Sequence, residues 1–95
     1  MRLDNGAVRS VAGQFSAAAE LIDDAARMHL GHLAFDGARA GRSYAARGDA
    51  VRAGLAGLVA DLARWSRAAA EIAVALRVGA DRCADAELSA AARIA

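Results

Sequence analysis

The chain has 95 residues, which is enough for one small domain. Its 12 basic residues, all Arg, and 11 acidic residues leave a net charge of +1, which argues against a nucleic-acid-binding protein. Alanine occupies 29 positions, Pro and Thr are absent, and β-branched residues never cluster, so the composition excludes a β-sheet and predicts an all-α fold. The single cysteine, Cys83, excludes an intramolecular disulfide.

The beginning of the chain does not have the pattern of a general secretory signal peptide. Asp4 and Asn5 stand where the apolar part of such a signal would start. Further along, no uncharged apolar run approaches the roughly 18 residues of a transmembrane helix. We therefore predict no membrane span, and export would have to use another route.

The first predicted helix covers about residues 6–29. Its apolar stripe repeats every seven residues and consists of Val8, Phe15 and Ile22, flanked by Val11, Ala18 and Ala25 and by Ala12, Ala19 and Ala26. Asp4 or Asn5 is a suitable N-cap, and Gly31 is a suitable residue just beyond the C-terminus. Residues 30–42 then read as a connection, because Gly31, Asp36-Gly37 and Gly41 interrupt any period. Asp36 or Ser43 would cap the helix that follows.

The second predicted helix covers about residues 40–92. Two apolar lines run along it at seven-residue intervals, one through Tyr44, Val51, Leu58, Trp65 and Ile72, and the other through Leu55, Leu62, Ala69, Leu76 and Cys83. Together they predict one heptad seam sustained over about five repeats, which is typical of a supercoiling helix.

The two helices are expected to form an antiparallel hairpin of unequal arms. At about 1.5 Å per residue, the first helix is about 35–40 Å long and the second about 75 Å. The first helix then covers only half of the second, and leaves the line through Ile72, Leu76 and Cys83 largely uncovered. Since an uncovered apolar stripe favours association, we predict a dimer of hairpins that forms a four-helix bundle. The predicted interface is Phe15, Ile22, Leu58, Leu62, Trp65, Ile72 and Leu76, with Trp65 and Ile72 as its hot spots.

Three stretches of the chain resemble a known family. They are Val11-Ala12-Gly13-Gln14-Phe15 through Leu21-Ile22, then Phe35-Asp36-Gly37-Ala38-Arg39-Ala40-Gly41-Arg42 with Ala45-Ala46-Arg47, and finally Leu76-Arg77, Ala80-Asp81 and Cys83-Ala84-Asp85-Ala86-Glu87. In these stretches the chain resembles the EspC-like proteins associated with type VII (ESX) secretion in actinobacteria, which are similar in plan to the Trp-X-Gly and PE helical hairpins. Phe35 and Gly37 resemble the Trp-X-Gly turn, with Phe in place of Trp.

The resemblance implies a non-enzymatic protein that a type VII system exports in a folded and paired state. Its secretion element, Tyr-x-x-x-Asp/Glu, corresponds here to Cys83 and Glu87, so Cys replaces Tyr and only the acid matches. The implied partners are another helical hairpin, in a homodimer or a heterodimer, and the secretion machinery, and the implied location is outside the cell or in its envelope. The alternative is a cytosolic dimerisation or adaptor module, in which Cys83 simply continues the apolar seam and Glu87 is a solvated acid.

The residues that carry chemistry give no enzyme or cofactor site. No phosphate-binding loop, nucleophile elbow or pair of acids in a cleft is present in the sequence, and we predict neither catalysis nor a cofactor. His29, His32 and Asp36 are spaced like metal ligands, but Gly31 interrupts the helix between the histidines and no cysteine lies nearby, so we predict no metal site. A nucleic-acid-binding surface on the arginines around Arg42 is disfavoured by the net charge.

Overall fold

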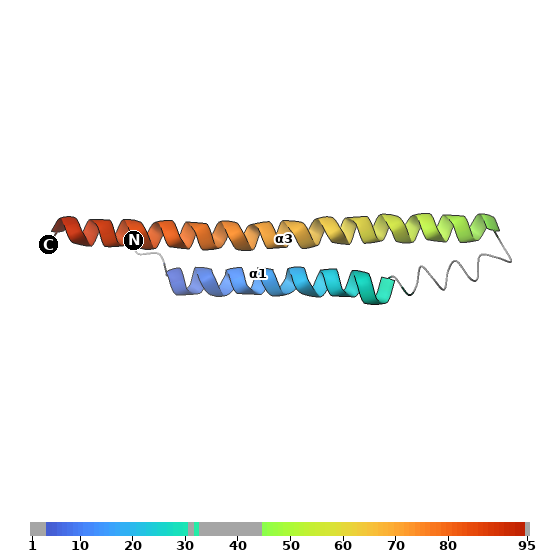
Figure 1. The fold of residues 1–95 in the computed structure, drawn as a ribbon, viewed down its shortest axis with the longest axis horizontal. Coiled ribbons are helices and arrows are strands. Elements are labelled where there is room, and N and C mark those ends of the chain that lie inside the picture. Colours follow the sequence, from blue (N-terminus) through green and yellow to red (C-terminus); the bar gives the residue numbers. More distant parts are fainter. Residues whose placement is uncertain (1–3, 31, 33–44, 95) are drawn as a thin grey trace.

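The computed structural model describes residues 4–30, 32 and 45–94, and it shows a long helical hairpin (Figure 1). Helix α1 (Asn5–Ala25) continues as a short π-helix, η1 (Ala26–Leu30), and it lies antiparallel beside the 50-residue helix α3 (Ala45–Ile94). The described residues contain no strand, and the principal extents are 78 × 16 × 15 Å. The prediction of an all-α, two-helix hairpin is confirmed.

Helix α1 begins at the cap that its sequence supplies. The Asp4 side chain accepts a hydrogen bond from the Ala7 N–H at 3.0 Å, and the Asp4 carbonyl accepts one from Val8 at 3.1 Å. Asp4, rather than Asn5, is therefore the N-cap, because it satisfies a backbone donor that has no partner within the helix.

The π-helical turn at the end of α1 changes which side chain faces α3. The inward residues of α1 alternate in steps of three and four up to Ala26, and the next step of three would point His29 towards α3. The wider turn of η1 instead leaves His29 exposed and Leu30 half-buried. An apolar side chain thus continues the contact that an imidazole would have ended.

Several predicted features lie outside the described residues. Helix α3 is described from Ala45 to Ile94 against the expected range of about 40–92. Residues 40–44 of that range lie outside the described part, as do Gly31, the possible caps Asp36 and Ser43, and the turn residues Phe35 and Gly37.

Small residues hold the two helices together. The inward side of α3 follows a regular 4–3 spacing of half-buried and buried residues, namely Leu55, Val59, Leu62, Ser66, Ala69, Ala73, Leu76, Ala80 and Cys83. Within residues 4–30, 32 and 45–94, the buried apolar residues are all alanines: Ala12, Ala19, Ala26, Ala73 and Ala80. Because alanine has no side chain beyond Cβ, the two backbones approach closely and the core between them is thin.

The position of α1 along α3 differs from the expected one. Ser66 Oγ donates to the Ala19 carbonyl at 2.9 Å, and Arg9 pairs with Asp81 at 2.7 Å. Helix α1 therefore lies beside residues 55–83 of α3 and not beside the half nearest the turn. Leu76 and Cys83 were expected to be uncovered, and this was wrong: both are half-buried in the hairpin. This position brings Ala12 level with Ala73, and both alanines are buried between the helices.

Candidate functional site

The large apolar side chains that remain exposed lie mostly on one side of the hairpin. On α1 and η1 they are Val11, Leu21 and Met28, and on α3 they are Val51, Leu58, Trp65 and Ile72. We call these seven residues the apolar face. Trp65, the one tryptophan of the chain, is 61% exposed, and Leu21 is 70% exposed. Side chains of this size are usually covered in a folded protein, so the apolar face is the candidate site.

The ion pair and the groove between the helices show which residues share a side. Arg9 and Asp81 meet across the two helices, and Asp23, Arg27 and Ala60 line one groove. Seen along the hairpin from one end, these residues lie clockwise of the inward residues on one helix and anticlockwise of them on the other. In an antiparallel pair, this places them on the same side of the hairpin. The residues displaced in the opposite sense must then share the other side. That set contains Val11, Leu58, Trp65 and Ile72, so both helices contribute to the apolar face.

The predicted interface residues divide into two groups. Phe15, Ile22, Leu62 and Leu76 are half-buried between α1 and α3, where they hold the hairpin together. Leu58, Trp65 and Ile72 are exposed on the apolar face. The sequence predicted one seam on the second helix, whereas the structure separates it into two lines of which only one faces α1.

Two members of the apolar face were not found by sequence reasoning. Leu21 and Met28 lie on α1 and η1, off the stripe that was expected to face the second helix. Their spacing of seven residues matches the spacing of Leu58, Trp65 and Ile72, and that shared period is the signal that would have found them.

The C-terminal pair has a mixed environment. Cys83 is half-buried at the end of the hairpin seam, and Glu87, four residues later on α3, is exposed. The two side chains lie one turn apart on the same face of α3, but Glu87 is beyond the level at which α1 begins and is exposed. The carboxylate is therefore more accessible than the thiol.

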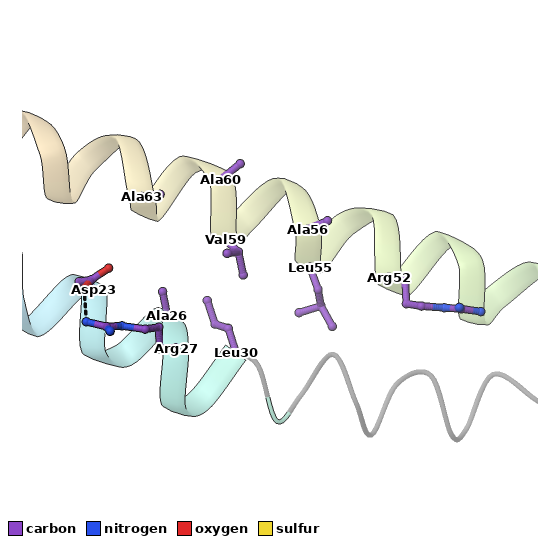
Figure 2. A pocket seen from close by; sticks show the side chains of 10 residues that line it. All are labelled: Asp23, Ala26, Arg27, Leu30, Arg52, Leu55, Ala56, Val59, Ala60 and Ala63. Carbon is purple, nitrogen blue, oxygen red and sulfur yellow. Dashed lines mark hydrogen bonds and ion pairs between the residues drawn. The ribbon is translucent and has the colours of Figure 1, made fainter.

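A groove of about 490 Å³ opens between the end of the first arm and residues 52–63 of α3. Figure 2 shows the side chains that line it, and they include Asp23, Arg27 and Ala60 from the side opposite the apolar face. The side chains of Leu30, Leu55 and Val59 converge in it. Its charged side chains already have partners within their own helices: Arg27 pairs with Asp23, and Arg52 pairs with Asp49 at 2.8 Å. With its charges paired in this way, the groove has no described group that would select a charged ligand.

The charged residues offer no reactive cluster among the described residues. Ion pairs within helices, such as Asp61 with Arg64, involve exposed side chains, and each stabilises by under about 1 kcal/mol. Within residues 4–30, 32 and 45–94, no group of three potential metal ligands is found, and His29 and His32 are both exposed. In the same ranges, no helix combines the length and apolar character needed to cross a bilayer.

The exposed surface of the chain is large for its mass. It amounts to 7109 Å², whereas a compact monomer of 9.7 kDa exposes about 5,100 Å². Because the excess includes large apolar side chains, the isolated hairpin leaves much of the hydrophobic effect unused.

Comparison with known proteins finds no similar protein. The chain matches no protein-family model, no curated protein and no solved structure.

Proposed function

We propose that this chain is a non-enzymatic, EspC-like type VII secretion substrate or secretion-associated protein that acts by helical association with a partner hairpin. The observation that carries the association is the apolar face, with Trp65 and Leu21 more than half exposed. A second hairpin laid against this face would complete a four-helix bundle and remove these side chains from water.

The export part of the proposal is supported by the sequence resemblance and by the C-terminal end of α3. Glu87 projects from a regular helix and is open to a receptor, whereas the family's aromatic position is held by the half-buried Cys83. In this proposal Glu87 provides the recognised charge, and Cys83 keeps its segment attached to the folded hairpin.

The experiment is an export assay in an actinobacterial host with and without a working type VII ATPase. A tagged copy is followed in the cell pellet and in the culture filtrate, together with a marker for lysis. We expect the protein in the filtrate only when the ATPase works. Retention in both strains, when every annotated hairpin gene of the host's type VII loci is also expressed, would contradict the export proposal.

A matched pair of substitutions tests the role of the carboxylate. Glu87→Ala should lower the amount exported at least tenfold, because it removes the one matching acid of the secretion element. Asp85→Ala removes an equally exposed acid of the same helical turn and should leave export unchanged. Equal export of the two variants would show that the charge at Glu87 is not read.

The alternative function is a cytosolic dimerisation or adaptor module. The same apolar face supports it, and the half-buried position of Cys83 in the hairpin seam favours it, since a seam residue needs no export role. In the export assay this module would remain in the pellet of both strains while still forming a dimer.

A further inference from the structure

We infer that the apolar face binds a second copy of this chain, with the two α3 helices antiparallel about a two-fold axis at the level of Ala70. The inference rests on the association proposed above, and it adds the identity of the partner, the orientation and the register. Its basis is the order of large, small and charged residues along the exposed side of α3.

Two lines of different size run side by side along this part of α3. The large line is Val51, Leu58, Trp65 and Ile72, and the small line, three residues further on in each case, is Gly54, Asp61, Ala68 and Ala75. In an antiparallel pair of helices, the large line of one copy packs against the small line of the other. In a parallel pair each line would meet itself, so that two Trp65 side chains would crowd one layer and two Ala68 side chains would leave the next layer empty.

The central layers set the register. With the axis at Ala70, Ile72 lies opposite Ala68 of the second copy, and Trp65 lies opposite Ala75 of the second copy. Each of these layers occurs twice because of the symmetry. The two largest side chains in the middle of the face therefore meet alanines, and large residues alternate with small ones as knobs do with holes.

The charges on the face fit the same register. Between Gly54 and Ala86, the charged residues of the two lines are Asp61 and Arg82. The axis places Asp61 opposite Gly79 of the second copy and Leu58 opposite Arg82 of the second copy. Arg82 then lies about 4.5 Å along the helix from Asp61, so its stem packs on Leu58 and its charge is next to the carboxylate. Parallel pairing would instead place like charges side by side. Asp61 also pairs with Arg64 of its own helix, and the second carboxylate oxygen leaves room for another donor.

The two neighbouring antiparallel registers fit less well. If the two-fold axis is moved by half a heptad, to the level between residues 66 and 67, Ile72 lies against the Asp61 carboxylate of the second copy. The same shift in the other direction places Gly79 against Ala68 of the second copy, which leaves a void in a central layer. The first arrangement buries the Asp61 carboxylate against an apolar side chain and away from Arg82 of the second copy, and the second leaves a layer unfilled. The axis at Ala70 avoids both, so it is preferred.

The axis also suits α1 and the available area. The hydrogen bond from Ser66 to Ala19 sets the relative level of the helices, so Ala70 is level with Phe15, near the middle of α1. The two copies of α1 then span the same length of the proposed dimer. The elongated hairpin exposes about 2,000 Å² more than a compact monomer of its mass, spread over all its sides, and a standard interface takes roughly 800 Å² from each partner.

Cross-linking of single cysteines tests the orientation directly. In a Cys83→Ala background, Gly54→Cys and Ala86→Cys each place one thiol at an exposed position of the face, and the Cβ at Gly54 meets nothing within 4 Å. With the axis at Ala70, residues 54 and 86 of different copies lie opposite each other. A mixture of the two variants should cross-link with a short bismaleimide reagent, whereas each variant alone should not. Cross-linking of Gly54→Cys with itself would overturn the antiparallel arrangement.

Sedimentation equilibrium of the purified full chain tests the partner and the face. We expect a dimer, and we expect Trp65→Ala to weaken it by about 100-fold or more, because Trp65 contributes twice to one symmetric interface. Val74→Ala is the matched control, since Val74 is 59% exposed on α3 but lies on the side of the Arg9–Asp81 ion pair, which we call the charged side. The dimer should survive this change within about threefold. A monomer at high micromolar concentration, or equal effects of the two variants, would overturn the inference.

The two proposals fail in different experiments. Export of a protein that is monomeric after purification would overturn the homodimer and leave the secretion proposal standing. A dimer with the expected cross-links that is never exported would overturn secretion and leave the homodimer standing.

Discussion

Helix α3 carries two apolar lines with the same period and very different surroundings. Leu55, Leu62 and Leu76 face α1 and are half-buried. Leu58 and Ile72 lie on the neighbouring line of the same helix and are exposed. The residue types are alike, so hydrophobicity alone does not explain which line is covered. The difference shows that a single helix such as α1, whose inward side alternates alanines with larger apolar residues, covers only one line, because two packed helices share a narrow contact.

The strongest way to test this difference is to shorten one leucine of each line. Leu62→Ala should lower the free energy of unfolding of the hairpin by about 2 kcal/mol, since it leaves a gap between α1 and α3. Leu58→Ala should change it by less than about 0.5 kcal/mol when the chain is diluted to the monomer, because Leu58 does not face α1. Urea unfolding followed by circular dichroism at low concentration measures both, and equal losses would show that the two lines are not distinct.

A second test enlarges a buried alanine between the helices. Ala12 is fully buried against α3, so Ala12→Leu should push the helices apart and cost about 1–2 kcal/mol of unfolding free energy. Ala17→Leu adds the same atoms to an exposed position of α1 and should be nearly neutral. Thermal unfolding of the two variants provides the measurement. An unchanged melting temperature for Ala12→Leu would mean that the helices are not closely packed there.

The smallest expected effect concerns the charged side of the hairpin. Arg9 and Asp81 join the two helices by an ion pair whose side chains are 46% and 63% exposed. Arg9→Ala should therefore lower the free energy of unfolding by less than about 1 kcal/mol at low salt, and by less still at about 1 M salt, where charges are screened. Urea unfolding at the two salt concentrations tests this, and a large loss that persists in high salt would indicate packing of the Arg9 stem instead.

Much of the fold could be predicted from local patterns. The alanine content and the absence of proline predicted helices, the seven-residue spacing of Val8, Phe15 and Ile22 predicted the inward side of α1, and Asp4 was one of two predicted caps. These features depend on neighbours three and four residues away along one helix, and such neighbours are fixed by helical geometry.

The candidate site could be predicted only in part. Trp65 and Ile72 were expected at an interface, and the structure leaves both exposed on the apolar face. Cys83 and Leu76 were expected to be uncovered, and they are half-buried because α1 lies further along α3 than expected. The π-helical turn that leaves His29 exposed and turns Leu30 inward had no local signal in the sequence.

The sequence by itself determined that the chain forms two amphipathic helices, where α1 begins, and which residues repeat every seven positions. Only the tertiary structure decided how far α1 lies along α3 and which of the two apolar lines it covers. The physical reason is that a heptad repeat sets a direction around one helix, and it looks the same after each shift of seven residues. The choice among such shifts depends on matching small residues across two helices, as Ala12 matches Ala73, and this matching exists only when both helices are in place.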